Sequence, residues 1–292
     1  MTNRFSKRSL NELTSTYTLP QFHRSVSGGI AATHTIRRKN MKRMIVPLAL
    51  AALLSLPFLA QAEGMGVYVA PKMGFGYLKG YDAQSVYWDD EDKHISSDDS
   101  NKIGMGSDTV FGGGIAVGYD FKRMGVPVRA ELEYAVFGDA KSKRTVRKDW
   151  LSGDYRTSIG IQTLFANAYY DFHNSSAFTP YVGLGLGLSF VEMKGKYNGT
   201  WNSPWGSASY SDSYGTKSTT NFAWNLGGGV SYAITNQIGL ELGYRFVWIG
   251  KGETKKYSMS YSYAGNDYVD TEYFKTKDLK MHQVMLGMRY TF

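Results

Sequence analysis

The sequence has 292 residues, 42% apolar and 20% charged, and it lacks cysteine, which excludes a disulfide-stapled scaffold and any thiolate metal site or nucleophile. A mean hydropathy of −0.33 argues against a helical membrane protein. Residues 1–62 hold nine of the 33 Lys and Arg residues but only one of the 25 acidic residues. The whole net charge of +8 therefore comes from this segment, and residues 63–292 are neutral overall. The charge gives no reason to expect a nucleic-acid partner.

Residues 41–62 have the three parts of a secretory signal peptide in the right order. A cationic start at 41–43 precedes an apolar run at 44–59 and a small-x-small site at 60–62. The run is shorter than the roughly 20 residues that a membrane-spanning helix needs. We therefore predict cleavage before Glu63; a buried core helix is the alternative interpretation of the apolar run.

Residues 1–40 precede this signal and are rich in Ser, Thr and Arg, without a clear hydrophobic period. We expect them to be disordered and to lie outside the folded domain. Either translation begins at Met41, or the chain carries an extended presequence. The folded domain is predicted to span 63–292.

From Glu63 onward, apolar and polar residues alternate in segments of about ten residues, which is the pattern of β-strands. The segment 128–136 places Val128 and Leu132 on one face and Arg129 and Glu131 on the other. A strand of a soluble β-sandwich would show the same alternation, so one segment cannot distinguish a soluble sheet from a membrane barrel. The complete set of alternating segments makes this distinction. Eight segments fit: 66–78, 109–121, 126–138, 159–172, 179–193, 221–234, 238–250 and 279–292.

The eight segments have the length and the alternation of transmembrane β-strands. Lipid offers no hydrogen-bond partner for an open sheet edge, so the sheet must close. Short turns at 122–125, 173–178 and 235–237 alternate with long polar loops at 79–108, 139–158, 194–220 and 251–278. We predict an all-β fold: an eight-stranded antiparallel up-and-down transmembrane β-barrel with short periplasmic turns and four long extracellular loops.

Three stretches, 167–172, 180–187 and 287–292, resemble the opacity-protein (Opa-like) family of eight-stranded outer-membrane barrels. The terminal Phe292, with Tyr290 two residues earlier, resembles the signal that such barrels present to the barrel assembly machinery. The resemblance implies a multi-pass protein in the outer membrane of a Gram-negative bacterium, in contact with outer-membrane lipid and lipopolysaccharide. It also implies an adhesin or a structural barrel, but family loops differ and loops carry function.

The predicted inward faces collect charged and polar side chains. An eight-stranded barrel is only wide enough for its own side chains to fill, and buried charges must be paired. We therefore expect a salt-bridged plug rather than a conducting pore. Its members would be Lys72, Asp120, Arg129, Glu131, Glu133, Asp171, Glu241, Arg245, Gln283 and Arg289.

No pattern supports an enzyme, a cofactor or a metal site. Gly183, Gly185 and Gly187 repeat with period two, unlike a dinucleotide fingerprint, and are expected to let opposite barrel walls approach. Glu131 and Glu133 share a face, but a filled lumen leaves no substrate cleft. The histidines of the folded domain are His94, His173 and His282, and none has a serine partner or metal-ligand spacing.

The loops carry the candidates for recognition. Loop 79–108 is acidic, with Asp89–Asp92, and loop 139–158 is basic. Two interpretations stay open for this pair: an adhesive surface, or solvated loops that attract each other. Loop 194–220 is aromatic, which is typical of a binding surface, although these rings could equally form a cap or lie in the lipid interface. Its members are Tyr197, Trp201, Trp205, Tyr210 and Tyr214.

Three classes of function remain. The first is a surface barrel whose loops bind a host or matrix ligand, and the second is a structural envelope barrel without a specific ligand. The third, a small porin or an outer-membrane enzyme, is disfavoured by the charged lumen and by the missing catalytic set. The sequence does not separate the first two classes.

Overall fold

The computed structural model describes residues 66–81, 84–88, 106–148, 151–203, 206–263 and 266–292. The expected extension and signal peptide at 1–62, and the acidic run Asp89–Asp92, lie outside the described residues. Among the described residues, no helix has the length and apolarity needed to cross a membrane.

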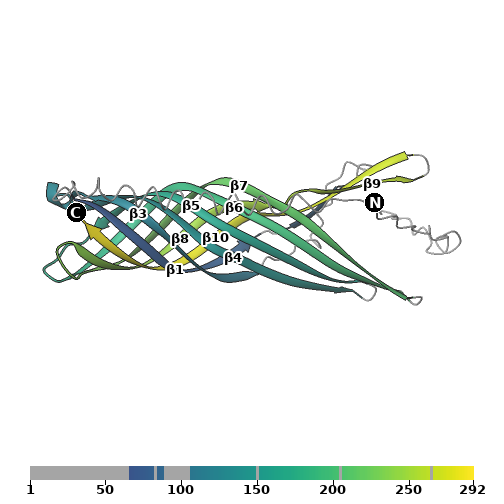
Figure 1. Cartoon of the computed structure of the whole chain (residues 1–292), viewed down its shortest axis with the longest axis horizontal. Helices are drawn as coiled ribbons and strands as arrows, with labels where there is room; N and C mark the ends of the chain where they lie inside the picture. The colour runs from purple at the N-terminus through teal and green to yellow at the C-terminus, as the bar shows by residue number, and fades with distance from the viewer. Residues whose placement is uncertain (1–65, 82–83, 89–105, 149–150, 204–205, 264–265) are drawn as a thin grey trace, which may run out of the picture. The chain divides into compact units, whose positions relative to one another are not determined.

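Eight antiparallel strands form a closed ring, as predicted (Figure 1). Each strand pairs with its neighbour in the ring, and the β1–β10 pairing, from Tyr68↔Thr291 to Tyr81↔Asp278, closes it. The ring strands are β1 (Val67–Tyr81), β3 (Ser107–Asp120), β4 (Val128–Lys148), β5 (Leu151–Asp171), β6 (Phe178–Ser203), β7 (Gly206–Ala233), β8 (Ile238–Glu253) and β10 (Asn266–Thr291).

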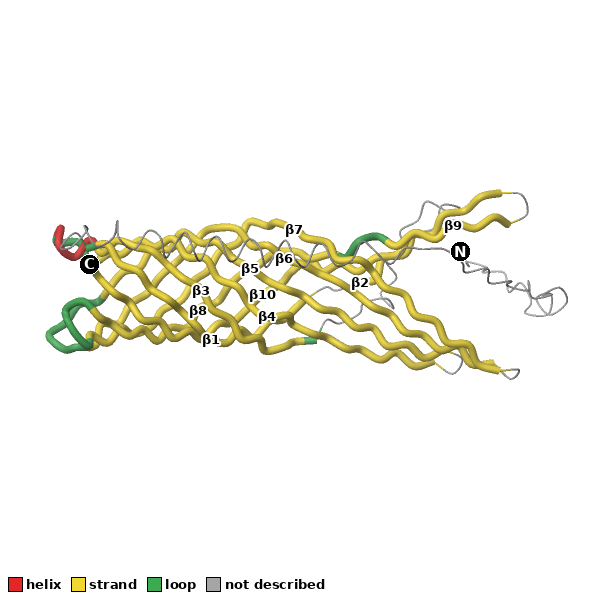
Figure 2. Tube along the Cα trace, viewed as in Figure 1, coloured by secondary structure: helices red, strands yellow, loops and turns green. Residues whose placement is uncertain are grey.

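Two short strands add to the ring at one end of β10. Strands β2 (Gln84–Trp88) and β9 (Tyr257–Tyr263) both pair antiparallel with its first half. A 3-10 helix, η3 (Phe121–Met124), forms the turn between β3 and β4 at the other end of the barrel (Figure 2). Gly125 ends this helix with φ 77°, a backbone conformation that favours glycine.

The alternation of side chains sorts the barrel into a lipid-facing band and a filled interior. Large apolar side chains are exposed on the outside, where they would face lipid; Leu184 and Leu186 are both 55% exposed. Their inward neighbours Gly183, Gly185 and Ser189 are buried. The barrel therefore has the apolar exterior that a membrane-spanning strand requires.

The strands are longer than the sequence predicted, and this corrects three of the expected loops. The hairpin β4–β5 pairs as far as Lys148↔Leu151, and β6–β7 pairs as far as Ser203↔Gly206. Most of the expected loops 139–158 and 194–220 is therefore β-sheet, and the expected loop 251–278 contains β9 and half of β10.

The physical reason is a change of phase in the alternation. On β6, Leu188 and Phe190 point outward and Ser189 inward, whereas two residues later Val191 and Met193 point inward and are buried. Beyond the lipid band the outward face meets water and the inward face meets the barrel core, so polar and apolar residues exchange places. The strand therefore continues beyond the point where its outward residues stop being apolar.

Candidate functional site

The half of the barrel interior that lies nearest the short turns holds an ion-pair network of four cations and four carboxylates. Arg129 lies at its centre, with 1% of the residue exposed. Its Nε and Nη2 donate to Asp171 Oδ2 and Oδ1 at 2.7 and 3.0 Å, and its Nη1 donates to Glu241 Oε1 at 2.7 Å. Strands β4, β5 and β8 are thus linked across the lumen through one guanidinium.

A second centre lies further along the axis. Lys72 Nζ contacts Glu131 Oε2 at 2.6 Å and Glu133 Oε2 at 3.0 Å. Arg245 Nη2 donates to Glu133 Oε1 at 2.6 Å, and its Nε donates to Gln283 Oε1 at 2.5 Å. Every carboxylate in this centre therefore faces a cation, as burial of charge requires.

Tyrosine rings complete the charged region. Tyr68 is fully buried and its hydroxyl donates to Glu131 Oε1 at 3.0 Å. The Arg129 guanidinium lies over the rings of Tyr169 and Tyr181, at 5.0 and 5.2 Å from their centroids. Such cation–π contacts stabilise a desolvated guanidinium beyond its ion pairs.

The structure brings together Lys72, Arg129, Glu131, Glu133, Asp171, Glu241, Arg245 and Gln283. Arg289 joins more loosely, with Nη1 at 3.6 Å from Glu241 Oε1. Asp120 was expected in this network, and the structure corrects its place. Its carboxylate instead accepts a hydrogen bond from the Lys122 backbone N–H and caps η3, because Asp120 is the last residue of β3 where the chain turns.

The glycine stripe on β6 serves neighbouring strands rather than opposite walls, contrary to expectation. Asn225 Nδ2 on β7 donates to Asn167 Oδ1 on β5 at 2.9 Å, across the intervening β6. A Cβ at Gly185 would lie 2.0 Å from Asn167 Oδ1 and 2.3 Å from Asn225 Nδ2. The missing side chain therefore leaves the space that this hydrogen bond occupies.

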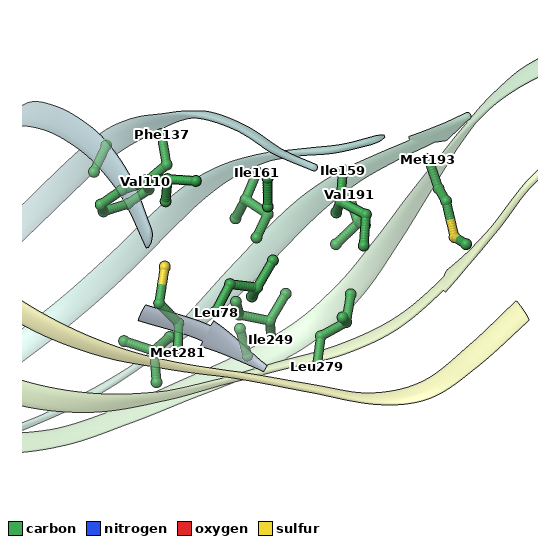
Figure 3. Packing of buried hydrophobic residues seen from close by; sticks show 14 of the residues in the cluster. Leu78, Val110, Phe137, Ile159, Ile161, Val191, Met193, Ile249, Leu279 and Met281 are labelled. Atoms are coloured by element: carbon green, nitrogen blue, oxygen red, sulfur yellow. The ribbon is translucent and has the colours of Figure 1, made fainter. Parts of the chain in front are cut away.

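The half of the barrel nearest the long hairpins has an apolar interior that the sequence reasoning missed (Figure 3). Side chains from the ring strands converge there; Val191, Ile249 and Leu279 are fully buried. Figure 3 shows Ile159, Ile161, Val191, Ile249 and Leu279 pointing into the same interior space. The exchange of polar and apolar positions beyond the lipid band is the sequence signal from which this core could have been predicted.

Aromatic rings close the top of this core. Tyr155 packs against Tyr197 and Phe274 with ring centroids 4.4 and 5.7 Å apart, and Tyr214 packs against Phe274 at 4.5 Å. Tyr197 is 8% exposed and Tyr214 is 2% exposed. The expectation of an exposed binding ring is therefore wrong for Tyr197, and for these two residues the cap interpretation holds.

Two of the other three aromatic candidates of this segment are placed by strand register alone. Trp201 lies on β6 opposite Leu151 and Ala208, and Tyr210 lies on β7 opposite Gly199. Trp205 lies outside the described residues. Register alone thus places Trp201 near the ends of both long hairpins.

Two cavities bear on whether the described part of the barrel could hold a small molecule. A cavity of about 40 Å³ lies among Lys72, Tyr169, Glu241 and Arg245, little more than the space of one or two waters. A polar recess of about 270 Å³ opens at the short-turn end, beside Asp120, His173 and Arg289. In the described part of the chain, no three His, Asp or Glu residues are grouped as metal ligands.

Aromatic pairs lie at the short-turn end of the lipid band. Tyr290 and Phe292 pack edge to face at 5.0 Å, as do Tyr170 and Phe172. The Phe292 N–H also donates to the Val67 carbonyl at 3.0 Å, so the last residue is held at the β1–β10 closure. Aromatic girdles of this kind mark the interface between lipid and water.

The outer face of the long hairpins carries polar side chains that pair between neighbouring strands. Asp154 lies between Lys143 and Thr145, with Lys143 Nζ 3.0 Å from Oδ2 and Thr145 Oγ1 donating to Oδ1 at 2.7 Å. The hydrogen bond from Thr145, together with Lys143, lowers the pKa of the Asp154 carboxyl. Lys194 reaches Asp139 at 3.5 Å on the same face. Exposed pairs of this kind contribute little to stability.

Comparison with known proteins gives consistent matches. The family model described as "Outer membrane protein beta-barrel domain" matches residues 46–292. Outer membrane protein PagN of Salmonella typhimurium is 33% identical over 234 residues, which cover 78% of this chain and 90% of PagN. A putative adhesin of Rickettsia bellii is 29% identical over 66% of this chain and 80% of its own length. The solved structure of Neisserial surface protein A has a TM-score of 0.42 at 19% identity, covering 78% and 97% of the two chains.

Proposed function

The chain belongs to the outer membrane protein beta-barrel domain family and lies in the outer membrane, and on that premise we propose that it is an adhesin-type surface barrel that binds a host or matrix ligand through its extracellular hairpins. The matched relatives described above are named as an outer-membrane protein and a putative adhesin, not as enzymes. Both names support the proposal without identifying a ligand.

The observation that carries the proposal is the paired sheet that β4, β5, β6 and β7 form beyond the lipid band. From Val191 to Ser203 on β6, about 40 Å of strand continues at about 3.3 Å per residue. The apolar core and the Tyr155–Tyr197 contact fill the interior at its base. This sheet is a rigid support, and rigid aromatic side chains bind at a low cost in conformational entropy.

The register shows that the ends of two long hairpins are neighbours. Leu151 begins β5 directly opposite Trp201 on β6, so the ends of the β4–β5 and β6–β7 hairpins are neighbours. Trp201 belongs to this joint end, and Trp205 follows it in the sequence, outside the described residues. Tryptophan is enriched among the residues that dominate binding energy at protein interfaces.

The test replaces Trp201 and Trp205 by Ala together and measures attachment of whole cells to a ligand-bearing surface. We expect attachment to be lost while heat-modifiable gel mobility, which reports barrel folding, is unchanged. The matched control replaces Tyr257 and Tyr273 by Ala, two aromatic residues of β9 and β10, and should keep attachment. If the Trp variant attaches as well as the wild type, a structural envelope barrel is the better description.

A further inference from the structure

Three cations stand in one line across three adjacent strands, on the outer face of the long hairpins. Lys143 on β4 pairs with Arg156 on β5, and Arg156 pairs with Lys196 on β6. The side chains of Lys143 and Arg156 are 55% and 57% exposed, and Lys196 is exposed as well. We call Lys143, Arg156 and Lys196 the cationic row.

The charges of this row are incompletely balanced within the protein. Like charges directly opposite each other on adjacent strands destabilise a sheet. Among the described residues, Asp154 is the carboxylate that reaches the row, at 3.0 Å from Lys143 Nζ and 3.8 Å from Arg156 Nη2. The hydrogen bond from Thr145 lowers the pKa of the Asp154 carboxyl, yet a single carboxylate leaves the row with excess positive charge.

The distance of the cationic row from the end of the lipid-facing band indicates which layer of the membrane lies beside it. On β6 the outward apolar residues end at Phe190, opposite Gln162 on β5. From Phe190 to Lys196 the strand advances about 20 Å at about 3.3 Å per residue, which is about 15 Å in height at a strand tilt of about 40°. The row thus lies above the acyl chains, at the level of the sugars of outer-leaflet glycolipids.

The direction of the row selects the partner. The outward face of a barrel strand points away from the barrel axis, along the membrane plane, so a ligand of this face must stand beside the barrel. A partner on another cell would instead approach the hairpin ends. A phosphorylated glycolipid of the same membrane lies beside the barrel and carries the opposite charge.

We propose that the cationic row of Lys143, Arg156 and Lys196 binds the phosphate groups in the sugar layer of outer-leaflet lipopolysaccharide. The anion lies between neighbouring cations of the row and offsets their mutual repulsion, as charge-assisted hydrogen bonds to phosphate do. The bound glycolipid holds the β4–β5 and β6 strands upright above the membrane. This inference does not depend on the adhesin function, since it concerns the side of the hairpins and not their ends.

The test uses the mature barrel in nanodiscs of three compositions: phospholipid alone, phospholipid with phosphorylated lipopolysaccharide, and phospholipid with the same lipopolysaccharide after dephosphorylation. The thermal midpoint is read by heat-modifiable gel mobility. Binding to the folded state raises the midpoint, and we expect phosphorylated lipopolysaccharide to raise it by about 5 °C over the dephosphorylated form. The double variant Arg156→Gln, Lys196→Gln should lose this difference.

The matched control is Lys122→Gln, Lys255→Gln, which removes the same charge from two exposed lysines elsewhere and should keep the difference. The double variant can be judged even if it folds less well, because each protein is compared with itself in two nanodiscs. The proposal is overturned if the wild type shows no difference, or if the double variant keeps it. It is also overturned if inorganic phosphate or a soluble anionic polysaccharide, added to phospholipid nanodiscs, raises the midpoint as much.

Discussion

Glu241, like Glu133, is a carboxylate that joins two cations of the lumen. It is 5% exposed, accepts from Arg129 Nη1 at 2.7 Å and lies 3.6 Å from Arg289 Nη1. A buried ion pair gives little net stability relative to an apolar pair of the same shape, because both charges were desolvated to form it. Removing one partner is different, since it leaves a buried charge without compensation.

We expect Glu241→Ala to lower the free energy of unfolding by about 3 kcal/mol, at the lower end of the range for a broken buried pair, because Arg129 keeps its two bonds to Asp171. Urea titration of the folded barrel measures this. Asp154→Ala is the control, since its pairs lie on the exposed face of the hairpins and should contribute little. Equal effects of the two substitutions would mean that the lumen is hydrated and the network weak.

The hydrogen bond across β6 makes a second prediction at the residue scale. Gly185→Ala would place a Cβ within 2.3 Å of both Asn167 Oδ1 and Asn225 Nδ2, which must separate and lose their bond. We expect a loss of about 1–3 kcal/mol of stability, measured by the same titration. Gly138→Ala is the control, because its Cβ would meet its nearest neighbour, Phe111 O, at 3.4 Å. A combined Gly185→Ala, Asn225→Ala variant should lose less than the sum of the two single effects.

At the scale of the strands, the membrane-facing part of the fold could be predicted and the part above the membrane could not. Between Val182 and Phe190 the outward residues are apolar and the inward ones small, which is the pattern of a lipid-facing strand. From Val191 onward the same strand faces water outside and a core inside, so its polarity inverts. A search for one continuous phase ends the strand at that point.

The same inversion explains which site residues were predictable. Arg129, Glu133 and Arg245 stand out in sequence because charges interrupt apolar strands. Tyr197 stands in a stretch rich in Gly, Ser and Lys, and its burial depends on Tyr155, which is distant in sequence and meets it only across the β5–β6 pairing. Contacts between strands of different hairpins are not readable from local periodicity.

The outward assignment of β6 gives a prediction at the element scale. Leu186 lies in the middle of the lipid band and is 55% exposed, and an Arg near the bilayer midplane costs about 2–4 kcal/mol. Leu186→Arg should therefore reduce the fraction of protein that folds in outer membranes, measured by heat-modifiable mobility. Ser209→Arg, near the end of the β6–β7 hairpin where the residue is exposed, should not. Equal tolerance at both positions would contradict the assigned lipid face.

At the scale of the whole molecule, the first prediction concerns maturation. The cationic start, the apolar run and the small-x-small site at 60–62 predict cleavage before Glu63. Mass spectrometry of the protein from isolated outer membranes should find Glu63 at the N-terminus. Substituting Ala60 and Ala62 by Arg should block cleavage and leave the precursor. Recovery of residues 1–40 on the mature protein would contradict the prediction.

The lumen of the whole barrel contains two barriers in series, and this arrangement predicts how conductance responds to mutation. Ions entering from the short-turn end meet the Arg129 network, and ions entering from the hairpin end meet the apolar core around Ile161 and Val247, which are 2% and 0% exposed. A hydrophobic constriction excludes ions by dewetting, independently of any salt bridge. Each barrier should therefore block the lumen without the other.

We expect the wild type, Glu241→Ala and the variant Ile161→Ser, Val247→Ser all to show near-zero conductance in planar bilayers. The triple variant, in which both barriers are weakened, should show discrete single-channel steps, because water can then enter the lumen along its whole length. Heat-modifiable mobility must confirm that each variant is folded before its conductance is measured. Stable large steps in the wild type would refute a closed lumen, and steps in Glu241→Ala alone would show that the apolar core does not seal the barrel.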